Sequence, residues 1–375
     1  MSDSSERAAR KLLAKADIEI GGSRPWDIQV HDPRLYARVF RFGSLGLGEA
    51  YMDGWWDAPA PDQLIDKLIS ARLQETVRFS FAELLDIAKG YLFNLQSPSR
   101  APEVAEKHYD LGNDLYKAML DPRLVYTSGY WSGTPAAGNL AEAQEAKLDL
   151  ICRKIGLTAG DRVLDIGCGF AGFAKYAAEK YGAHVVGITV SREQLALGKE
   201  ICEGLPVELR FEDYRDVNEP FDHIVSIEMI EAVGAKNFRT YMKVVERCLK
   251  PGGFFLLQAI GNNESVIAGD PWITKYIFPN GMLPSAAQLT QAFEGLLMIE
   301  DWHNFGPDYD KTLMAWFTNF DKAWPALRGK YGDRFYRMWK YYLLMCAGLF
   351  RARQTHVWQI VLSKGGVPGG YKSVR

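Results

Sequence analysis

The sequence predicts an α/β fold in which a mostly parallel, doubly wound sheet carries helices on both faces. Five short apolar runs, each suited to a buried strand, recur at residues 163–167, 185–190, 207–213, 224–228 and 254–260. Helical patterns separate these runs, and parallel strands require crossover connections of that kind. Two last strands are expected at residues 298–302 and 357–362. Ligands of such sheets bind at the carboxyl ends of the strands.

A glycine-rich turn follows the first of these runs. Gly167, Gly169 and Gly172 come after the strand that contains Asp165, and a helical pattern begins directly afterwards. Glycine adopts backbone angles that other residues avoid, so the main chain can approach a ligand closely. The spacing alone suggests a dinucleotide site, but the next strand ends in Thr189 instead of the acidic residue that binds a nicotinamide ribose.

A second turn favours a different cofactor. Residues 249–253 read Leu-Lys-Pro-Gly-Gly and lead into the apolar run at 254–257. This turn followed by a strand is typical of methyltransferases that use S-adenosylmethionine (SAM). We therefore predict a class I, Rossmann-like SAM-dependent methyltransferase, with a dehydrogenase as the alternative.

The chain is expected to hold two domains. Residues 1–92 are interpreted as a small N-terminal α+β domain and residues 105–375 as the catalytic domain. Residues 93–104 are predicted to be a linker because proline, serine and small residues are concentrated there. Within the catalytic domain, residues 262–297 and 303–355 are too long to be plain connections, so we expect helical lid insertions over the substrate.

Composition excludes several classes of protein. A net charge of −2, with 47% hydrophobic and 24% charged residues, describes an ordinary globular protein without general attraction to nucleic acid. The five cysteines have no metal-like spacing, so we expect no metal site and a reduced, cytoplasmic protein. No run approaches the roughly 18 apolar residues that would span a bilayer.

Residues 321–353 combine positive charge with an aromatic stripe. Eight basic residues stand there against two acidic ones. Side chains on one helix face recur at three- and four-residue steps, namely Phe335, Trp339, Tyr342, Cys346 and Leu349. This pattern is typical of a helix that contacts a membrane surface. A core-facing helix with solvated basic residues is the alternative.

Several longer blocks point to one family. They are residues 43–56, 108–114, 163–172, 213–216, 270–273, 276–281, 301–306, Tyr309 and 346–348. Over nearly its full length the sequence resembles the bacterial cyclopropane-fatty-acyl-phospholipid synthases, which are related to the mycolic acid cyclopropane synthases. The resemblance implies transfer of a methylene group from SAM to the cis double bond of an unsaturated phospholipid acyl chain. It further implies peripheral attachment to the inner face of the membrane, and a homodimer is possible.

The implied reaction forms a carbocation, and a base must remove a proton from the new methyl group to close the ring. In this family the base is thought to be a bound bicarbonate ion. Motif matching assigns its contacts to Ser128, Glu231, Gln258, the backbone of Ile260, and Tyr309. The best-known bacterial members carry Cys in place of Ser128, and His in place of both Gln258 and Ala232. A lipid methyltransferase that gives methylene or methyl-branched chains is the alternative function.

The resemblance also assigns the cofactor contacts. Gly167 and Gly169 should line the methionine and ribose side, while Asp165, Cys168 and Gly172 belong to the same turn. The remaining contacts should come from Thr189 and Gln194 at the ribose, Asp213 and Tyr214 at the adenine, and Tyr126 and Thr127 at the methionine end. Cys346 matches an active-site cysteine of the family. We expect a packing role for Cys346, because the reaction requires no nucleophilic side chain.

Overall fold

The structure is a computed structural model that describes residues 2–73 and 112–375. Two compact units are present. The first, here called the sheet unit, comprises Asn94–Ile267, Asn280–Tyr309 and His356–Arg375. The second, here called the helical unit, comprises Met1–Phe93, Ala268–Pro279 and Asp310–Thr355. Residues 268–279 of the first expected lid insertion and residues 310–355 of the second therefore belong to the same unit as the N-terminal residues. The predicted linker at 93–104 lies outside the described residues.

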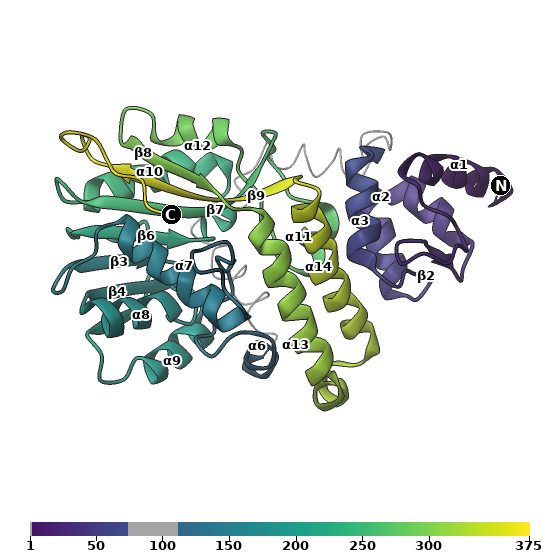
Figure 1. Ribbon diagram of the computed structural model, residues 1–375, viewed down its shortest axis with the longest axis horizontal. Coiled ribbons are helices and arrows are strands. Elements are labelled where there is room, and N and C mark those ends of the chain that lie inside the picture. Colours follow the sequence, from purple (N-terminus) through teal and green to yellow (C-terminus); the bar gives the residue numbers. More distant parts are fainter. Residues whose placement is uncertain (1, 74–111) are drawn as a thin grey trace. The chain divides into compact units, whose positions relative to one another are not determined.

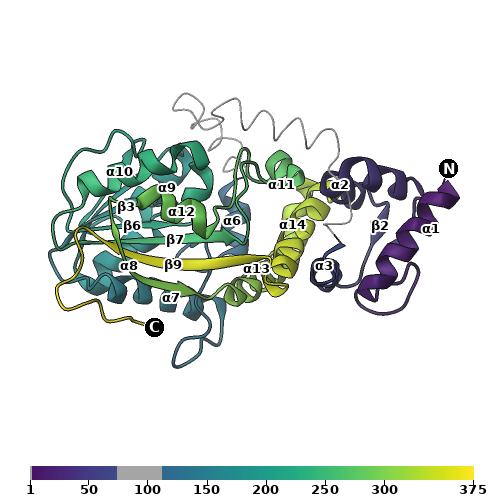
Figure 2. The ribbon, with the colours of Figure 1, turned by 90° about the horizontal axis from the view of Figure 1, so that it is seen from above.

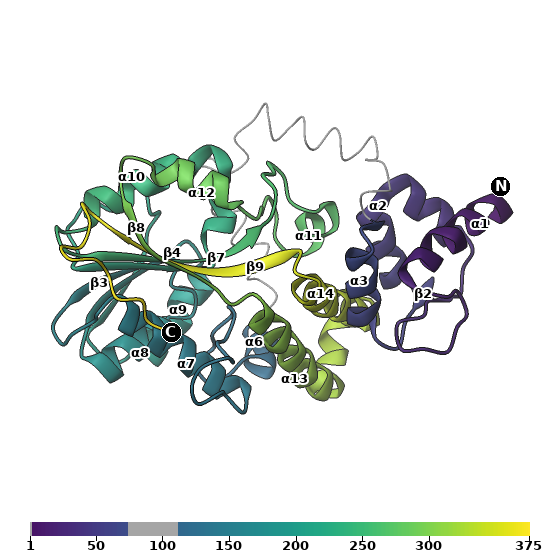
Figure 3. The same ribbon diagram turned by 45° about the horizontal axis from the view of Figure 1, so that its top comes forward.

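The sheet unit is built on seven strands. Their spatial order is β5 (Val207–Phe211), β4 (His184–Thr189), β3 (Arg162–Ile166), β6 (His223–Ile227), β7 (Phe254–Asn262), β9 (Thr355–Ser363) and β8 (Met298–Asn304). The first five are joined by parallel pairing, whereas β8 and β9 pair antiparallel (Figure 3). All seven strands predicted from the apolar runs are present, and the mostly parallel sheet is confirmed.

Helices cover both faces of this sheet (Figure 1). One face carries α7 (Leu140–Lys154), α8 (Gly172–Tyr181) and α9 (Arg192–Ile201), and the other carries α10 (Phe238–Cys248) and α12 (Ala286–Phe293). A hydrophobic core lies on each face of the sheet, and successive side chains of a strand point into opposite cores. Val163 therefore packs with α7 and α8, whereas Leu164 packs with α10 and α12. Burial on both faces explains why the strands read as continuous apolar runs.

The predicted glycine turn joins β3 to α8. Gly167 has φ +79, and a Cβ built there would lie 2.5 Å from Met229 Cγ. Gly169 has φ +54 and faces open space. A side chain at Gly172 would collide with the Arg123 carbonyl oxygen at 2.8 Å. The turn therefore needs glycine for its backbone at two positions and for close packing at the third.

The helical unit contains two short strands and a set of packed helices. They are α1 (Ser2–Leu13), β1 (Gln29–Val30), α2 (Arg34–Met52), β2 (Trp56–Asp57), α3 (Pro61–Ser70), α11 (Pro271–Tyr276), the part of α13 (Pro307–Tyr331) from Asp310 onward, and α14 (Asp333–Arg351). Helix α14 packs against α3 and α2 (Figure 2). At the α3 contact a Cβ on Gly348 would lie 2.6 Å from the Asp62 carbonyl oxygen, so the two helices approach closely.

The predicted aromatic stripe of α14 faces the core at its centre. Trp339 and Tyr342 are buried, and Phe335 stacks on Trp339 with ring centroids 5.7 Å apart. Among the eight basic residues in 321–353, ion pairs within the unit hold Arg328, Arg334, Arg337 and Arg351. These contacts correspond to the core-facing alternative rather than to a membrane-facing helix.

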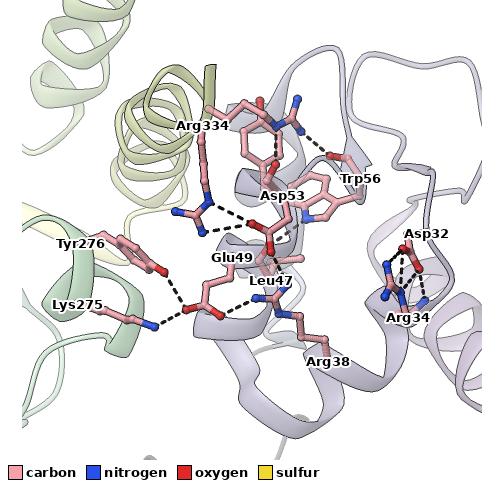
Figure 4. Close-up of polar contacts among 12 residues, drawn as sticks. Asp32, Arg34, Arg38, Leu47, Glu49, Asp53, Trp56, Lys275, Tyr276 and Arg334 are labelled. Atoms are coloured by element: carbon pink, nitrogen blue, oxygen red, sulfur yellow. Dashed lines mark hydrogen bonds and ion pairs between the residues drawn. The ribbon is translucent and has the colours of Figure 1, made fainter. Parts of the chain in front are cut away.

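A polar cluster joins α2 to α11 inside the helical unit (Figure 4). Glu49 on α2 accepts hydrogen bonds from Lys275 at 2.6 Å, Arg38 at 2.7 Å and the Tyr276 hydroxyl at 2.9 Å. Burial alone would raise the pKa of Glu49, but these hydrogen bonds outweigh burial and hold that pKa at about 2. The cluster ties residues more than 200 positions apart in the sequence.

Replacing Glu49 by Gln should destabilise the protein by about 1–3 kcal/mol near neutral pH, because three donors lose a charged acceptor. A carboxyl with a depressed pKa stabilises the fold above its unfolded pKa and loses that contribution as pH falls. The difference between variant and wild type should therefore shrink between about pH 4.5 and pH 2. Thermal unfolding across that range checks this, with Asp32→Asn as control because the partner of Asp32, Arg34, is exposed. An equal effect of both substitutions would contradict the assignment.

Candidate active site

The candidate site lies at the carboxyl edge of the parallel strands in the sheet unit. Strands β3 and β6 are neighbours in the sheet, and the helices that follow them, α8 after β3 and α10 after β6, lie on opposite faces. Ligands of doubly wound sheets bind at this switch point. Asp165 on β3, Thr189 at the end of β4 and Glu228 directly after β6 all fall at this edge.

Asp165 is buried beside the glycine turn. Its Oδ2 atom has no hydrogen-bond partner among the described residues. Burial raises the pKa of this carboxyl to about 7, and the nearby Lys147 only partly offsets that effect. A buried carboxylate oxygen without a partner is unusual, and the cationic methionine end of SAM would supply the missing donor.

The predicted ribose contacts lie together after β4. Thr189 Oγ1 and Gln194 Oε1 are 3.0 Å apart, and both residues are buried. Ser191 caps α9 by accepting a hydrogen bond from the Gln194 backbone N–H at 3.3 Å. The cap fixes Gln194 over the end of the strand. The side chains of Thr189 and Gln194 therefore lie together at the carboxyl end of β4, where the ribose contacts were predicted.

The predicted adenine contacts follow β5. Asp213 Oδ2 accepts a hydrogen bond from Arg215 at 2.7 Å, and its Oδ1 accepts one from the Arg215 backbone N–H at 3.0 Å. Tyr214 is buried edge-on against Tyr241, with ring centroids 5.2 Å apart. The Tyr214 side chain also contacts Arg215, which lies beside its hydroxyl and has its guanidinium carbon 4.7 Å from the ring centroid.

Tyr126 and Thr127 are held against α7. The Tyr126 ring meets that of Tyr116 edge-on at 5.2 Å. Gln144 donates a hydrogen bond to the Thr127 carbonyl oxygen at 2.7 Å, and Lys147 donates one to Thr127 Oγ1 at 2.6 Å. These contacts fix the irregular segment that was predicted to receive the methionine end.

Cys168 has a packing role within the turn. The residue is buried, and a Cβ on Gly187 of β4 would lie 3.0 Å from its Cβ atom. Burial raises the pKa of the Cys168 thiol well above its ordinary value, so this thiol stays protonated. Its predicted place beside the cofactor therefore rests on the turn backbone rather than on its sulfur.

Glu228 collects the donors that were predicted to hold an ion. Its carboxylate accepts hydrogen bonds from the Ser128 backbone N–H at 3.0 Å, from Gln258 Nε2 at 2.7 Å and from the Tyr309 hydroxyl. Gln359 in turn donates to Gln258 Oε1 at 2.9 Å, which fixes the orientation of that amide. The Ser128 hydroxyl itself donates to the Gly129 carbonyl oxygen at 3.0 Å.

Glu231 takes the remaining predicted donor. Its Oε1 atom accepts a hydrogen bond from the Ile260 backbone N–H at 2.5 Å, and its buried Oε2 atom has no partner among the described residues. Burial, with a contribution from the neighbouring Glu228 charge, raises the pKa of Glu231 to about 8. Glu228 and Glu231 both keep some exposed surface as residues, as expected for side chains that line a ligand space.

One buried lysine faces these acids. Lys147 on α7 is fully buried, and burial lowers its pKa to about 8 although Glu228, Asp121 and Asp165 oppose that shift. The Lys147 ammonium on α7 is thus the positive charge that acts on Glu228, Asp121 and Asp165 in this part of the described structure. Buried charges of this kind are stabilised only when they are paired.

Cys346 belongs to the helical unit, on α14. Burial and the nearby Asp270 raise the pKa of its thiol to about 12, so the thiol is protonated at neutral pH. A protonated thiol on an apolar helix face fits the expected packing role.

Comparison with known proteins identifies the family. The model described as mycolic acid cyclopropane synthetase matches residues 96–360. The chain belongs to this family. It is 51% identical over 369 residues to a cyclopropane-fatty-acyl-phospholipid synthase of Escherichia coli K12, covering 98% of this chain and 96% of that protein. It is 33% identical over 361 residues to a tuberculostearic acid methyltransferase of Mycobacterium tuberculosis, covering 90% and 83%.

A solved structure of the cyclopropane synthetase family shares the fold. The mycolic acid cyclopropane synthase CmaA1, complexed with SAH and CTAB, superimposes with a TM-score of 0.65 at 27% identity. The match covers 70% of this chain and 98% of that one. The predicted SAM-dependent methyltransferase fold is therefore confirmed. In the described part of the chain, no helix combines the length and apolarity needed to cross a membrane.

Two residues at the site were given no role from sequence. Glu228 was interpreted as the last residue of a strand, and its position at the carboxyl edge was the available signal. Lys147 lies on the buried face of α7, spaced three residues after Gln144 and four before Ile151. A lysine within the apolar positions of a helix is rarely buried without a partner.

The predicted bicarbonate contacts do not fit an added ion as they stand in this cyclopropane synthetase. Ser128, Gln258 and Tyr309 already donate to Glu228, and the Ile260 N–H already donates to Glu231. A bicarbonate among these donors would bring a further negative charge against two carboxyl groups. We therefore derive no step through bicarbonate.

The stability of a Glu231→Gln variant relative to wild type should increase as pH rises. The folded state holds the Glu231 proton up to about pH 8, whereas the unfolded chain releases it near pH 4.5. The wild type therefore loses stability between those values, and the neutral amide does not. We expect the variant to gain about 1–3 kcal/mol relative to wild type between pH 5 and pH 8.

Urea unfolding at the two pH values measures this difference. Glu246→Gln is the matched control, because Glu246 pairs with Lys364 away from the site. A variant that becomes less stable than wild type as pH rises would show that Glu231 is ionised in the folded protein.

Proposed function

We propose that this chain transfers a methylene group from SAM to the cis double bond of an unsaturated phospholipid acyl chain and so forms a cyclopropane ring. The observation that carries this proposal is the pair Glu228 and Glu231 at the carboxyl edge of the sheet, directly beside the glycine turn. An acidic, solvent-shielded edge next to a sulfonium site suits a reaction that forms a carbocation, because an ionised carboxylate there can stabilise the positive charge. The 51% identity to a synthase of that name supports the same substrate class.

The chemistry sets what the residues must do. Bound SAM supplies an electrophilic methyl group, and the alkene is a weak nucleophile that must be held close to it in a site that excludes water. The carboxylates of the site stabilise the positive charge that develops on the acyl chain. One of them must also accept a proton from the new methyl group so that the C–H electron pair closes the ring.

The proposed cofactor contacts follow the predicted ones. Asp165 would face the methionine amino group, because its Oδ2 atom lacks a partner. Gln194 would donate to the ribose, and the Tyr214 hydroxyl would meet the adenine side. Gly169 leaves the backbone open toward the cofactor. The buried, unpartnered Oδ2 atom of Asp165 at this edge supports a ligand there.

Methyl-branched or methylene products are the second candidate. The relative named tuberculostearic acid methyltransferase, at 33% identity, supports it. Both reactions share the first transfer step and differ in the fate of the carbocation. The position of the base relative to the new methyl group therefore decides the product.

Product analysis separates these reactions. Lipids from a bacterium that lacks cyclopropanes should gain acyl chains heavier by 14 mass units when this gene is expressed. A product that resists hydrogenation is the expected cyclopropane, whereas one that gains two mass units is a methylene chain. A saturated product with branched-chain fragmentation would indicate methyl transfer followed by reduction, and unchanged lipids would refute the proposal altogether.

We also propose that the helical unit brings the protein to the inner face of the membrane as a peripheral protein. Phe40 and Phe42 on α2 are exposed, by 42% and 36%, and Arg41 lies between them with its guanidinium 5.0 Å from the Phe42 ring. Exposed aromatic side chains beside a basic one suit an anionic lipid surface. This pair replaces the α14 stripe as the candidate contact.

Replacing Phe40 and Phe42 by Ala should lower turnover on anionic vesicles about tenfold, because each side chain contributes apolar area to the membrane contact. Affinity for S-adenosylhomocysteine should stay within twofold, since the helical unit's α2 does not belong to the cofactor edge. Product formation on vesicles measures turnover, calorimetry measures the cofactor affinity, and vesicle co-sedimentation measures the contact itself, with exposed Phe211 of the sheet unit as the control position. Unchanged vesicle binding in the double variant would disprove the contact.

A further inference from the structure

The donors expected to hold an ion hold a side chain in this protein. Three groups from distant parts of the chain converge on the Glu228 carboxylate, namely the Ser128 backbone N–H in the segment before α7, Gln258 Nε2 on β7 and the Tyr309 hydroxyl on α13. A planar carboxylate presents the same O–C–O arrangement and negative charge as bicarbonate. The Glu228 side chain therefore accepts the same hydrogen bonds that a bound bicarbonate ion would accept.

The backbone conformation of Glu228 is unusual, and strand β7 holds it in place. Glu228 is the first residue after β6 and adopts φ +52, a left-handed conformation that non-glycine residues seldom take. Its backbone N–H donates to the Gln258 carbonyl oxygen at 2.8 Å, so β7 holds both its main chain and its side chain. Backbone strain that neighbouring structure enforces is common at functional positions.

The surrounding charges suit a proton acceptor. Burial raises the pKa of Glu228 above its ordinary value, although the donors from Ser128, Gln258 and Tyr309 and the nearby Lys147 partly offset that shift. A carboxylate with a raised pKa binds a proton more strongly than an ordinary one. Glu231, three residues further on, holds its proton up to about pH 8, mainly because it is buried and in part because Glu228 adds a negative charge nearby. Two adjacent carboxyl groups with different proton affinities can serve as acceptor and neutral neighbour.

We propose that Glu228 is the base of this enzyme and acts in place of bicarbonate. The inference rests on the proposed function. After methyl transfer, the S–CH3 bond has broken, a new C–C bond has formed and the acyl chain carries the positive charge. The Glu228 carboxylate then accepts one proton of the new methyl group, and the electrons of that C–H bond form the second ring bond. Glu228 ends neutral, and its proton returns to solvent before the next turnover.

Dependence on bicarbonate tests the inference without any substitution. Wild-type protein, SAM and unsaturated phospholipid vesicles are assayed in buffer purged of carbon dioxide and in the same buffer with added bicarbonate. We expect the two rates of cyclopropane formation to agree within twofold. A larger increase on addition of bicarbonate would overturn the inference while leaving the proposed function intact, whereas no product under either condition would refute the proposed function itself.

Substitution gives the second test. Glu228→Gln keeps the shape and removes the proton acceptor, so kcat should fall at least a hundredfold while the Kd for S-adenosylhomocysteine stays within threefold. Glu246→Gln, at a surface ion pair, is the matched control and should keep full activity. A smaller loss of kcat in Glu228→Gln, or an equal loss of cofactor affinity, would make Glu228 a structural residue and overturn the inference.

Chemical rescue covers the case in which the amide disturbs the site. Glu228→Gly opens the space that the carboxylate fills and frees the same three donors. We expect formate or bicarbonate to restore at least a tenth of the wild-type rate in this variant and to have no effect on wild type. If neither anion restores activity in a Glu228→Gly protein that is folded and binds S-adenosylhomocysteine, then an added anion does not replace the Glu228 carboxylate and the inference is contradicted.

Discussion

Enclosure of several carboxyl groups around one buried lysine is the constraint on which the site depends. Asp121, Asp165 and Glu228 all act electrostatically on Lys147, and Glu231 lies beyond Glu228. Acids this close cannot all be ionised without water or a cation, so their pKa values separate. The sheet supplies the geometry, because its switch point brings the ends of β3, β6 and β7 together. The same crowding raises the pKa values of Glu228 and Glu231 at the edge where we propose that the carbocation forms.

Local pattern was sufficient to predict the architecture. Both faces of the parallel strands are covered, so apolar runs such as 163–167 marked each strand, and the glycine turn marked the cofactor edge. The resemblance placed Ser128, Gln258, Ile260 and Tyr309 around one spot, and the structure does bring their polar groups to adjacent carboxylates. What these groups bind could not be predicted, because Glu228 shares its sequence signal with any residue that ends a strand.

Packing between distant segments accounts for the other differences. The stripe of Phe335, Trp339 and Tyr342 looks the same whether a membrane or a protein core covers it. Only the fold shows Trp339 and Tyr342 buried in the helical unit, with Arg337 on the same helix paired to Asp57. Lys147 was likewise hidden within a regular helix pattern. Its role depends on strands β3 and β6, which the sequence does not place next to α7.

The central claim of this account is that the donors Ser128, Gln258 and Tyr309 bind the Glu228 carboxylate and not a bicarbonate ion. A crystal structure of the complex with S-adenosylhomocysteine, grown in bicarbonate-containing buffer, would test it most directly. We predict that the Glu228 carboxylate stays hydrogen-bonded to all three donors. A planar anion on those donors, with Glu228 turned away, would contradict the account and return the role of base to bicarbonate.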